Sequence, residues 1–189
     1  MSPLEGAAAL LGLINVALVV RRSLWNYPFG IVMVVLYGFV FFEARLYSDA
    51  LLQVFFLVIQ LYGWWYWARS GQVEGGVAVG RLGWSARLGW VGGTAVAALL
   101  WGSAMARFTD AAAPHVDGAI ALTSVAAQIL QSRRKVESWV LWIAVDCAAV
   151  PLFWWRGLFA TSALYVVFLV MSVAGLLAWA RVLRHERAR

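Results

Sequence analysis

The segment LYSDALLQVFFLVIQLYGWWYWAR, residues 46–69, aligns without a gap with LFATSALYVVFLVMSVAGLLAWAR, residues 158–181. The same offset of 112 residues pairs residues 6–22 with residues 118–134, and each of these segments ends in two consecutive arginines. Each half of the chain is long enough for three apolar helices. A duplicated three-helix unit in a membrane is typical of transporters, because two similar halves can rock about a site between them.

The composition places the chain in a membrane. Of its 189 residues, 63% are hydrophobic and 13% are charged, and the mean hydropathy is +0.79. A soluble domain of this size could not bury so much apolar surface, so we expect an all-α integral membrane protein. Twelve Trp and six Tyr suit the belts that aromatic rings form at the membrane surfaces. One cysteine, Cys147, excludes an internal disulfide framework.

The apolar runs predict seven transmembrane helices. Spans this long and continuous are not typical of the alternating strands of a membrane barrel. The expected spans are residues 6–20, 27–42, 47–68, 87–106, 116–132, 138–155 and 158–180.

The basic residues predict the orientation. Under this layout twelve of the 15 Lys and Arg residues fall on one side, and three (Arg45, Arg107 and Arg156) fall on the other. The basic side is expected to be cytoplasmic, which puts the N-terminus outside and the C-terminus inside. The basic clusters thus act as topology determinants, and we expect no nucleic-acid partner.

The layout predicts three parts and a parallel repeat. Residues 1–69 form the first three-helix repeat, and residues 111–189 form the second repeat with a basic cytoplasmic tail. Residues 70–110 form a glycine-rich, flexible cytoplasmic linker followed by the fourth span. Because that single helix crosses the bilayer, both repeats begin on the outside.

Polar side chains at membrane depth are few, and such groups usually face the bundle interior or a water-filled path. On four spans they share a helix face, by their spacing of three, four or seven residues. These faces carry Gln53, Phe56 and Gln60; Ser124, Gln128 and Gln131; Trp139, Trp142 and Asp146; and Tyr165 and Ser172.

Asp146 is the most informative of these residues, because a carboxylate near the midplane costs about 2.5–3.5 kcal/mol on the insertion scale. A protonated or amide-bonded Asp146 that joins helices is one interpretation. The other is a site for a cationic ligand, in which Trp142 stacks on a flat ring. Trp139 suits an interfacial belt as well as a ligand contact. The glutamines could bind a carboxamide or sugar hydroxyls, or bond to another helix.

Several strings resemble the PnuC family of vitamin transporters. They include Leu46-Tyr47-Ser48-Asp49-Ala50-Leu51-Leu52-Gln53, Tyr62-Gly63-Trp64-Trp65, and the pattern Trp139-x-x-Trp142-x-x-x-Asp146 after a basic loop. The resemblance maps the family's binding region onto Gln53, Thr123, Gln128, Trp139, Trp142, Asp146 and Tyr165.

The resemblance implies a 3+1+3 helix arrangement similar to SWEET sugar transporters, a homotrimer, and a place in the bacterial inner membrane. It also implies uptake of nicotinamide riboside by facilitated diffusion. Related members carry thiamine or riboflavin, and a positively charged thiamine would suit Asp146 equally well.

An intramembrane enzyme or a scaffold subunit is the alternative from another class. An enzyme needs a nucleophile with a base, or a set of metal ligands. The sequence has no GxSxG or HExxH motif and no metal-ligand spacing. We therefore expect a transporter without catalytic residues, metal or cofactor.

Overall fold

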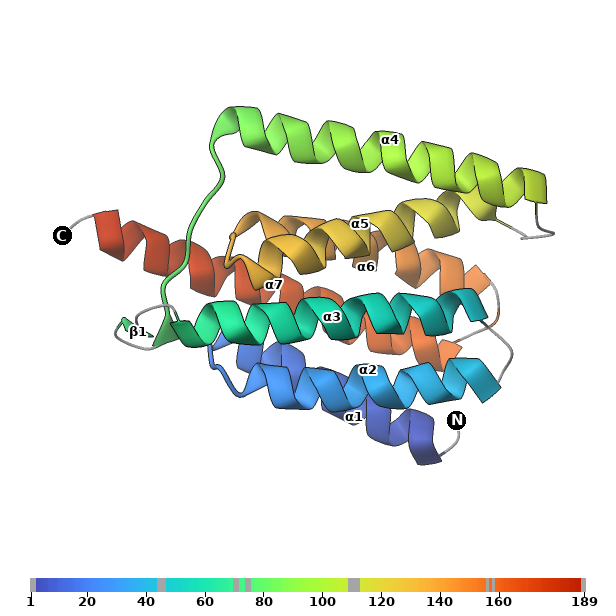
Figure 1. Ribbon diagram of the computed structural model, residues 1–189, viewed down its shortest axis with the longest axis horizontal. Coiled ribbons are helices and arrows are strands. Elements are labelled where there is room, and N and C mark those ends of the chain that lie inside the picture. The colour runs from blue at the N-terminus through green and yellow to red at the C-terminus, as the bar shows by residue number, and fades with distance from the viewer. Residues whose placement is uncertain are drawn as a thin grey trace. The chain divides into compact units, whose positions relative to one another are not determined.

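The computed structural model describes residues 3–43, 47–69, 72–73, 76–108, 113–155, 157 and 159–187. Within this part of the chain it has seven helices, as the sequence predicted (Figure 1). Arg45, Leu46, Arg156 and Leu158 lie outside the described residues. The helices are α1 (Pro3–Val20), α2 (Asn26–Glu43), α3 (Tyr47–Arg69), α4 (Trp84–Phe108), α5 (Pro114–Ser132), α6 (Glu137–Trp155) and α7 (Phe159–Arg187).

Among the described residues, three helices are long and apolar enough by themselves to cross a bilayer, namely α4, α6 and residues 161–185 of α7. Two shorter apolar helices cover residues 6–20 and 26–40. The helices extend the expected spans by a few residues at most ends. The largest extension is in α7, which continues through Arg187 because nothing in its last two turns breaks a helix.

The expected linker contains some regular structure. Strands β1 (Gln72–Val73) and β2 (Gly76–Val77) pair antiparallel, with Gln72 opposite Val77. Gly80 forms an isolated parallel bridge with Lys135. Gly80 also lies beside the Lys135 side chain, since a Cβ added at Gly80 would lie 3.0 Å from the Lys135 Nζ atom.

Residue contacts divide the chain into two compact units. Unit one contains residues 1–79 and 177–189, and unit two contains residues 80–176, so the boundary falls inside α7. In unit one α2 packs against both α1 and α3, and in unit two α5 packs against both α4 and α6.

The core of unit one is aromatic. Trp67 and Trp179, which are partners at the 112-residue offset, are both buried with their ring centroids 6.1 Å apart. The Trp179 indole N–H donates to the Val19 carbonyl at 3.2 Å. Tyr27 lies edge-on to Trp67 and under Gly63, where an added Cβ would lie 2.6 Å from the tyrosine oxygen. A glycine is therefore needed where α3 crosses Tyr27.

Unit two repeats this packing 112 residues later. Gly175 lies over the Trp139 ring, and a Cβ at Gly175 would approach three ring atoms to 2.6 Å. Trp139 is 1% exposed. The same glycine–aromatic contact thus occurs in both units, with Gly63 and Tyr27 in unit one and Gly175 and Trp139 in unit two.

The turns that follow α1 and α5 also match. Arg22 and Arg134 are the two non-glycine residues with positive φ in the described part of the chain, at 56° and 60°. In each turn the arginine N–H donates to the carbonyl oxygen three residues earlier. The N–H of the next residue donates to the carbonyl oxygen five residues before it, and all four hydrogen bonds are 2.9 Å long. This is a Schellman motif, whose left-handed position is usually glycine. An arginine there carries a steric cost of about 1–2 kcal/mol.

Candidate functional site

The structure distributes the nine predicted substrate-binding residues over both units. Three are on α3 in unit one, and the other six are on helices α5, α6 and α7 of unit two. The first group is Gln53, Phe56 and Gln60; the second group is Thr123, Gln128, Trp139, Trp142, Asp146 and Tyr165.

Asp146 lies in the middle of α6 and is 3% exposed. Its Oδ2 atom accepts a hydrogen bond of 3.0 Å from the Ser172 hydroxyl on α7. A hydroxyl stabilises a carboxylate but does not neutralise it. A buried carboxylate held in this way is suited to pairing with a cationic ligand.

Trp142 lies one helical turn before Asp146 on the same side of α6, as the sequence spacing predicted. Its indole N–H donates to the Gln131 side-chain oxygen on α5, at 2.5 Å. That bond fixes the direction of the ring while leaving the indole half-buried. Trp142 therefore combines an oriented aromatic face with proximity along the helix to a carboxylate.

Trp139 occupies a different environment. It is buried against Gly175, whereas a belt tryptophan faces the lipid. The belt interpretation of Trp139 therefore does not fit its burial. Among the tryptophans that end α3, Trp64 and Trp65 are exposed and suit a belt, whereas Trp67 is part of the core.

The remaining predicted residues of unit two are half-buried. Tyr165 has its ring 5.1 Å from Phe153 on α6 and 5.9 Å from Phe168 on α7. Thr123 lines a small hollow of about 320 Å³ between α5 and α6, at the end near His115. Gln128 is also half-buried on α5.

In unit one, Gln60 is the most enclosed of the three predicted residues, at 5% exposed. Its amide lies against Gly30 of α2, beside the Asn15 amide of α1. Asn15 donates to the Asn26 carbonyl at 2.6 Å. Gln53 is half-buried near Gly38, and Phe56 packs beside Phe55.

The repeat offset relates these two groups. Gly30, Val34 and Gln60 of unit one correspond to Trp142, Asp146 and Ser172 of unit two. At these positions unit one has the buried Gln60 amide beside Gly30, and unit two has a carboxylate with an indole. The amides of unit one can bind neutral polar groups, and the carboxylate of unit two can bind a cation.

Two residues that orient the site were noticed in the sequence but were not among the predicted site residues. Ser172 and Gln131 appeared as polar positions on their spans, and the structure shows that they bond to Asp146 and Trp142. The ion pair of Arg87 with Glu137, at 2.6 Å, was not anticipated. Fifty residues separate that pair, and no sequence pattern connects them.

Comparison with known proteins places these features in one family. The family model described as "Nicotinamide mononucleotide transporter" matches residues 2–181. The nicotinamide riboside transporter PnuC of Escherichia coli is 28% identical over 214 residues, covering 100% of this chain and 90% of the relative. The riboflavin/roseoflavin transporter RibM of Streptomyces davaonensis is 32% identical over 177 residues, covering 90% and 81%.

A solved structure, titled as the crystal structure of the vitamin B3 transporter PnuC, is similar in fold. The TM-score is 0.78 at 25% sequence identity, with 96% of this chain and 82% of that chain covered. The integral membrane helical fold and the resemblance to PnuC that the sequence predicted are confirmed by these comparisons.

Proposed function

We propose that this chain, which belongs to the nicotinamide mononucleotide transporter family, takes up nicotinamide riboside across the bacterial inner membrane. Membership in a family of membrane transporters accounts for the apolar helices and for the absence of familiar catalytic motifs from the sequence. Nicotinamide riboside joins a positively charged pyridinium ring, a carboxamide and a ribose. Its binding needs an anion, an aromatic surface and polar groups that both donate and accept hydrogen bonds.

The observation that carries the proposal is the arrangement of Asp146 and Trp142 on α6. The carboxylate is 3% exposed and is bonded to the neutral Ser172 hydroxyl. The indole one turn away is held by Gln131. A pyridinium ring stacked on Trp142 would gain cation–π attraction of about 0.5–2 kcal/mol and would offset the charge of Asp146. In unit two, Gln128 is the candidate to bind the carboxamide or the ribose.

The proposal includes a transport mechanism. Two three-helix repeats in a SWEET-like 3+1+3 arrangement would expose the site alternately to each side of the membrane, and the substrate would move down its gradient. The matched turns at Arg22 and Arg134, and the matched glycine contacts at Gly63 and Gly175, support two units of similar internal construction. We also propose that the N-terminus lies outside the cell and the C-terminus in the cytoplasm, and that the protein forms a homotrimer.

Riboflavin is the second candidate substrate, because RibM is a relative with 32% identity. The isoalloxazine ring of riboflavin is neutral, so it would gain little from a buried carboxylate. Thiamine has a cationic ring and is the third vitamin to compare. The charge of the ligand, rather than the presence of an aromatic ring, therefore separates riboflavin from the other two.

A thermal-stabilisation screen of the purified full-length protein tests the proposal. Ligands that bind only the folded state raise its stability by about 2.7 kcal/mol at 100 times their Kd. Nicotinamide riboside should raise the melting temperature at the lowest concentration, and riboflavin, whose ring is neutral, should have the least effect. A shift at the lowest concentration with thiamine instead would identify thiamine as the substrate. A shift with riboflavin alone would identify the chain as a flavin carrier, and no shift with any of the three would refute a vitamin site.

A further inference from the structure

Helices α4 and α5 approach each other most closely at the end where they are joined. A Cβ added at Gly102 on α4 would lie 2.8 Å from the His115 Cα, and one at Gly118 on α5 would lie 3.1 Å from the Gly102 nitrogen. From this crossing the two helices separate toward the first turns of α4, as Figure 1 shows. Two helices fixed at one end and spread at the other leave a groove between them.

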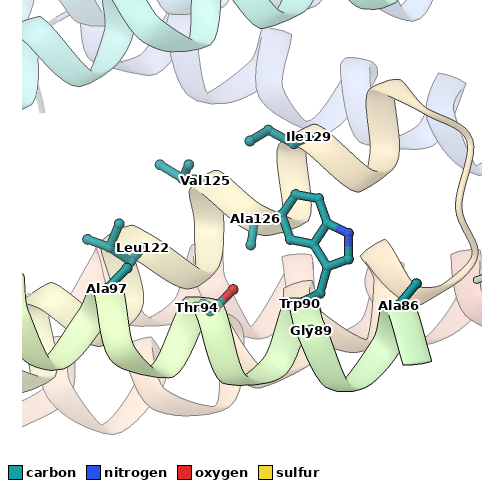
Figure 2. Close-up of a pocket in the computed structure, with 10 residues that line it drawn as sticks. Ala86, Gly89, Trp90, Thr94, Ala97, Leu122, Val125, Ala126 and Ile129 are labelled. Atoms are coloured by element: carbon teal, nitrogen blue, oxygen red, sulfur yellow. The ribbon is translucent and has the colours of Figure 1, made fainter. Parts of the chain in front are cut away.

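That groove has a volume of about 420 Å³ and lies between the first half of α4 and the second half of α5. Figure 2 shows Trp90 and Thr94 of α4 on one wall and Leu122, Val125 and Ile129 of α5 on the other. Its lining is almost entirely apolar. Since only 6% of the most apolar 18-residue stretch of α4 is buried, the groove opens onto the medium that surrounds this helix. In a membrane transporter that medium is lipid.

The spread end of the groove is also the basic end of unit two. Arg133 follows Ile129 by one helical turn and is exposed, and Arg81 is exposed just before α4 begins. The Lys135 ammonium lies over Gly80, next to Arg81 in the chain. Glu137, the acidic residue closest to this cluster in sequence, is already bound by Arg87 at 2.6 Å. An apolar groove with cations at its membrane-surface end has the charge pattern of an anionic lipid site.

We propose that the groove between α4 and α5 binds one anionic phospholipid, with an acyl chain along Trp90 and Gly93 and the phosphate near Arg81, Arg133 and Lys135. The exposed Trp84 ring, at the start of α4, would lie at headgroup depth. A bound lipid would fill the space between two helices whose close approach lies at their glycine crossing. It would thereby hold the first half of α4 to the rest of unit two.

Native mass spectrometry of the purified full-length protein, titrated with phosphatidylglycerol and with phosphatidylcholine of the same acyl chains, tests the proposal. Phosphatidylglycerol should bind at least about fivefold more tightly, because its headgroup has a net negative charge and each basic residue near anionic lipid contributes roughly 1 kcal/mol. Equal binding of the two lipids would overturn the role of the basic cluster.

Matched variants locate the site. Gly93→Leu fills the groove and should weaken phosphatidylglycerol binding about tenfold, since it displaces about two methylenes of an acyl chain at about 0.8 kcal/mol each. Gly92→Leu makes the same change on the adjacent residue, which does not line the groove, and should have little effect. Arg133→Gln should weaken binding about fivefold, whereas Arg107→Gln at the other end of α4 should not.

Two results contradict the proposal. If Gly93→Leu and Gly92→Leu bind phosphatidylglycerol equally, the lipid is not in the groove. If Gly93→Leu instead dissociates an oligomer without changing lipid binding, the groove is an interface with a second copy of the chain. Arg133→Gln changes an exposed side chain, so it remains informative even if Gly93→Leu does not fold.

Discussion

Replacing Asp146 by asparagine removes one charge from the proposed site and little else. Asparagine has nearly the shape of aspartate, and its side-chain oxygen can still accept the hydrogen bond that the Ser172 hydroxyl donates at 3.0 Å. The variant should therefore fold, and its melting temperature without ligand should equal or exceed that of the parent, because a buried charge has been removed. Any loss of affinity can then be attributed to the charge.

The size of the loss follows from the burial of the carboxylate. Two opposite charges about 4 Å apart attract by about 4 kcal/mol at the effective dielectric constant of about 20 that suits protein sites. Part of this attraction is cancelled by the desolvation of the ligand, so we expect a net loss of about 1.4–2.8 kcal/mol. Affinity for nicotinamide riboside should thus fall about 10- to 100-fold.

Isothermal titration calorimetry with two ligands provides the assay. Oxidised nicotinamide riboside has a cationic ring, and its dihydropyridine form has the same ribose and carboxamide without the charge. The parent should prefer the cationic form, and Asp146→Asn should bind both forms with similar affinity. Ser172→Ala retains the charge and serves as the control, with a smaller loss. If Asp146→Asn binds the cationic ligand within twofold of the parent, Asp146 has a structural role and the reasoning is wrong.

Three further predictions concern other residues of the site and the core. Trp142→Ala should weaken the binding of nicotinamide riboside by about 0.5–2 kcal/mol through the lost cation–π contact. Trp64→Ala changes an exposed position and should not weaken binding. Equal effects of the two variants in calorimetry would contradict a ligand contact at Trp142. Gln131→Leu should weaken binding less than Trp142→Ala, because it frees the indole without removing it, and an unchanged affinity would show that the Gln131 bond does not orient the site. Gly175→Ala should destabilise the protein by about 1–3 kcal/mol through overpacking against the Trp139 ring. Gly92→Ala, where an added Cβ meets open space, should slightly stabilise helix α4. Identical melting curves for the two variants would refute the packing argument.

The helices and the repeat could be predicted from the sequence because they depend on local and periodic properties. Runs of apolar residues identify membrane-spanning helices, and a shared offset pairs Gly63 with Gly175 before their contacts are known. The offset also pairs Arg22 with Arg134, which have the same unusual backbone conformation. A repeated sequence thus indicated a repeated local structure.

The neighbours of individual side chains could not be predicted in the same way. In helices that are apolar on every side, periodicity does not mark the face that is buried, so the burial of Trp139 against Gly175 had no signal in the pattern. The bond of Trp142 to Gln131 depends on how α5 and α6 pack, and the pair Arg87–Glu137 depends on the path of the linker. These contacts come from tertiary packing, which a single sequence does not encode as a motif.

Uptake of labelled nicotinamide riboside into liposomes that contain only the purified protein tests the central claim most directly. We predict that the vitamin enters until its internal and external concentrations are equal, without ATP or an ion gradient, and that Asp146→Asn slows its entry. Uptake no faster than into protein-free liposomes, or uptake of riboflavin but not of nicotinamide riboside, would contradict the account.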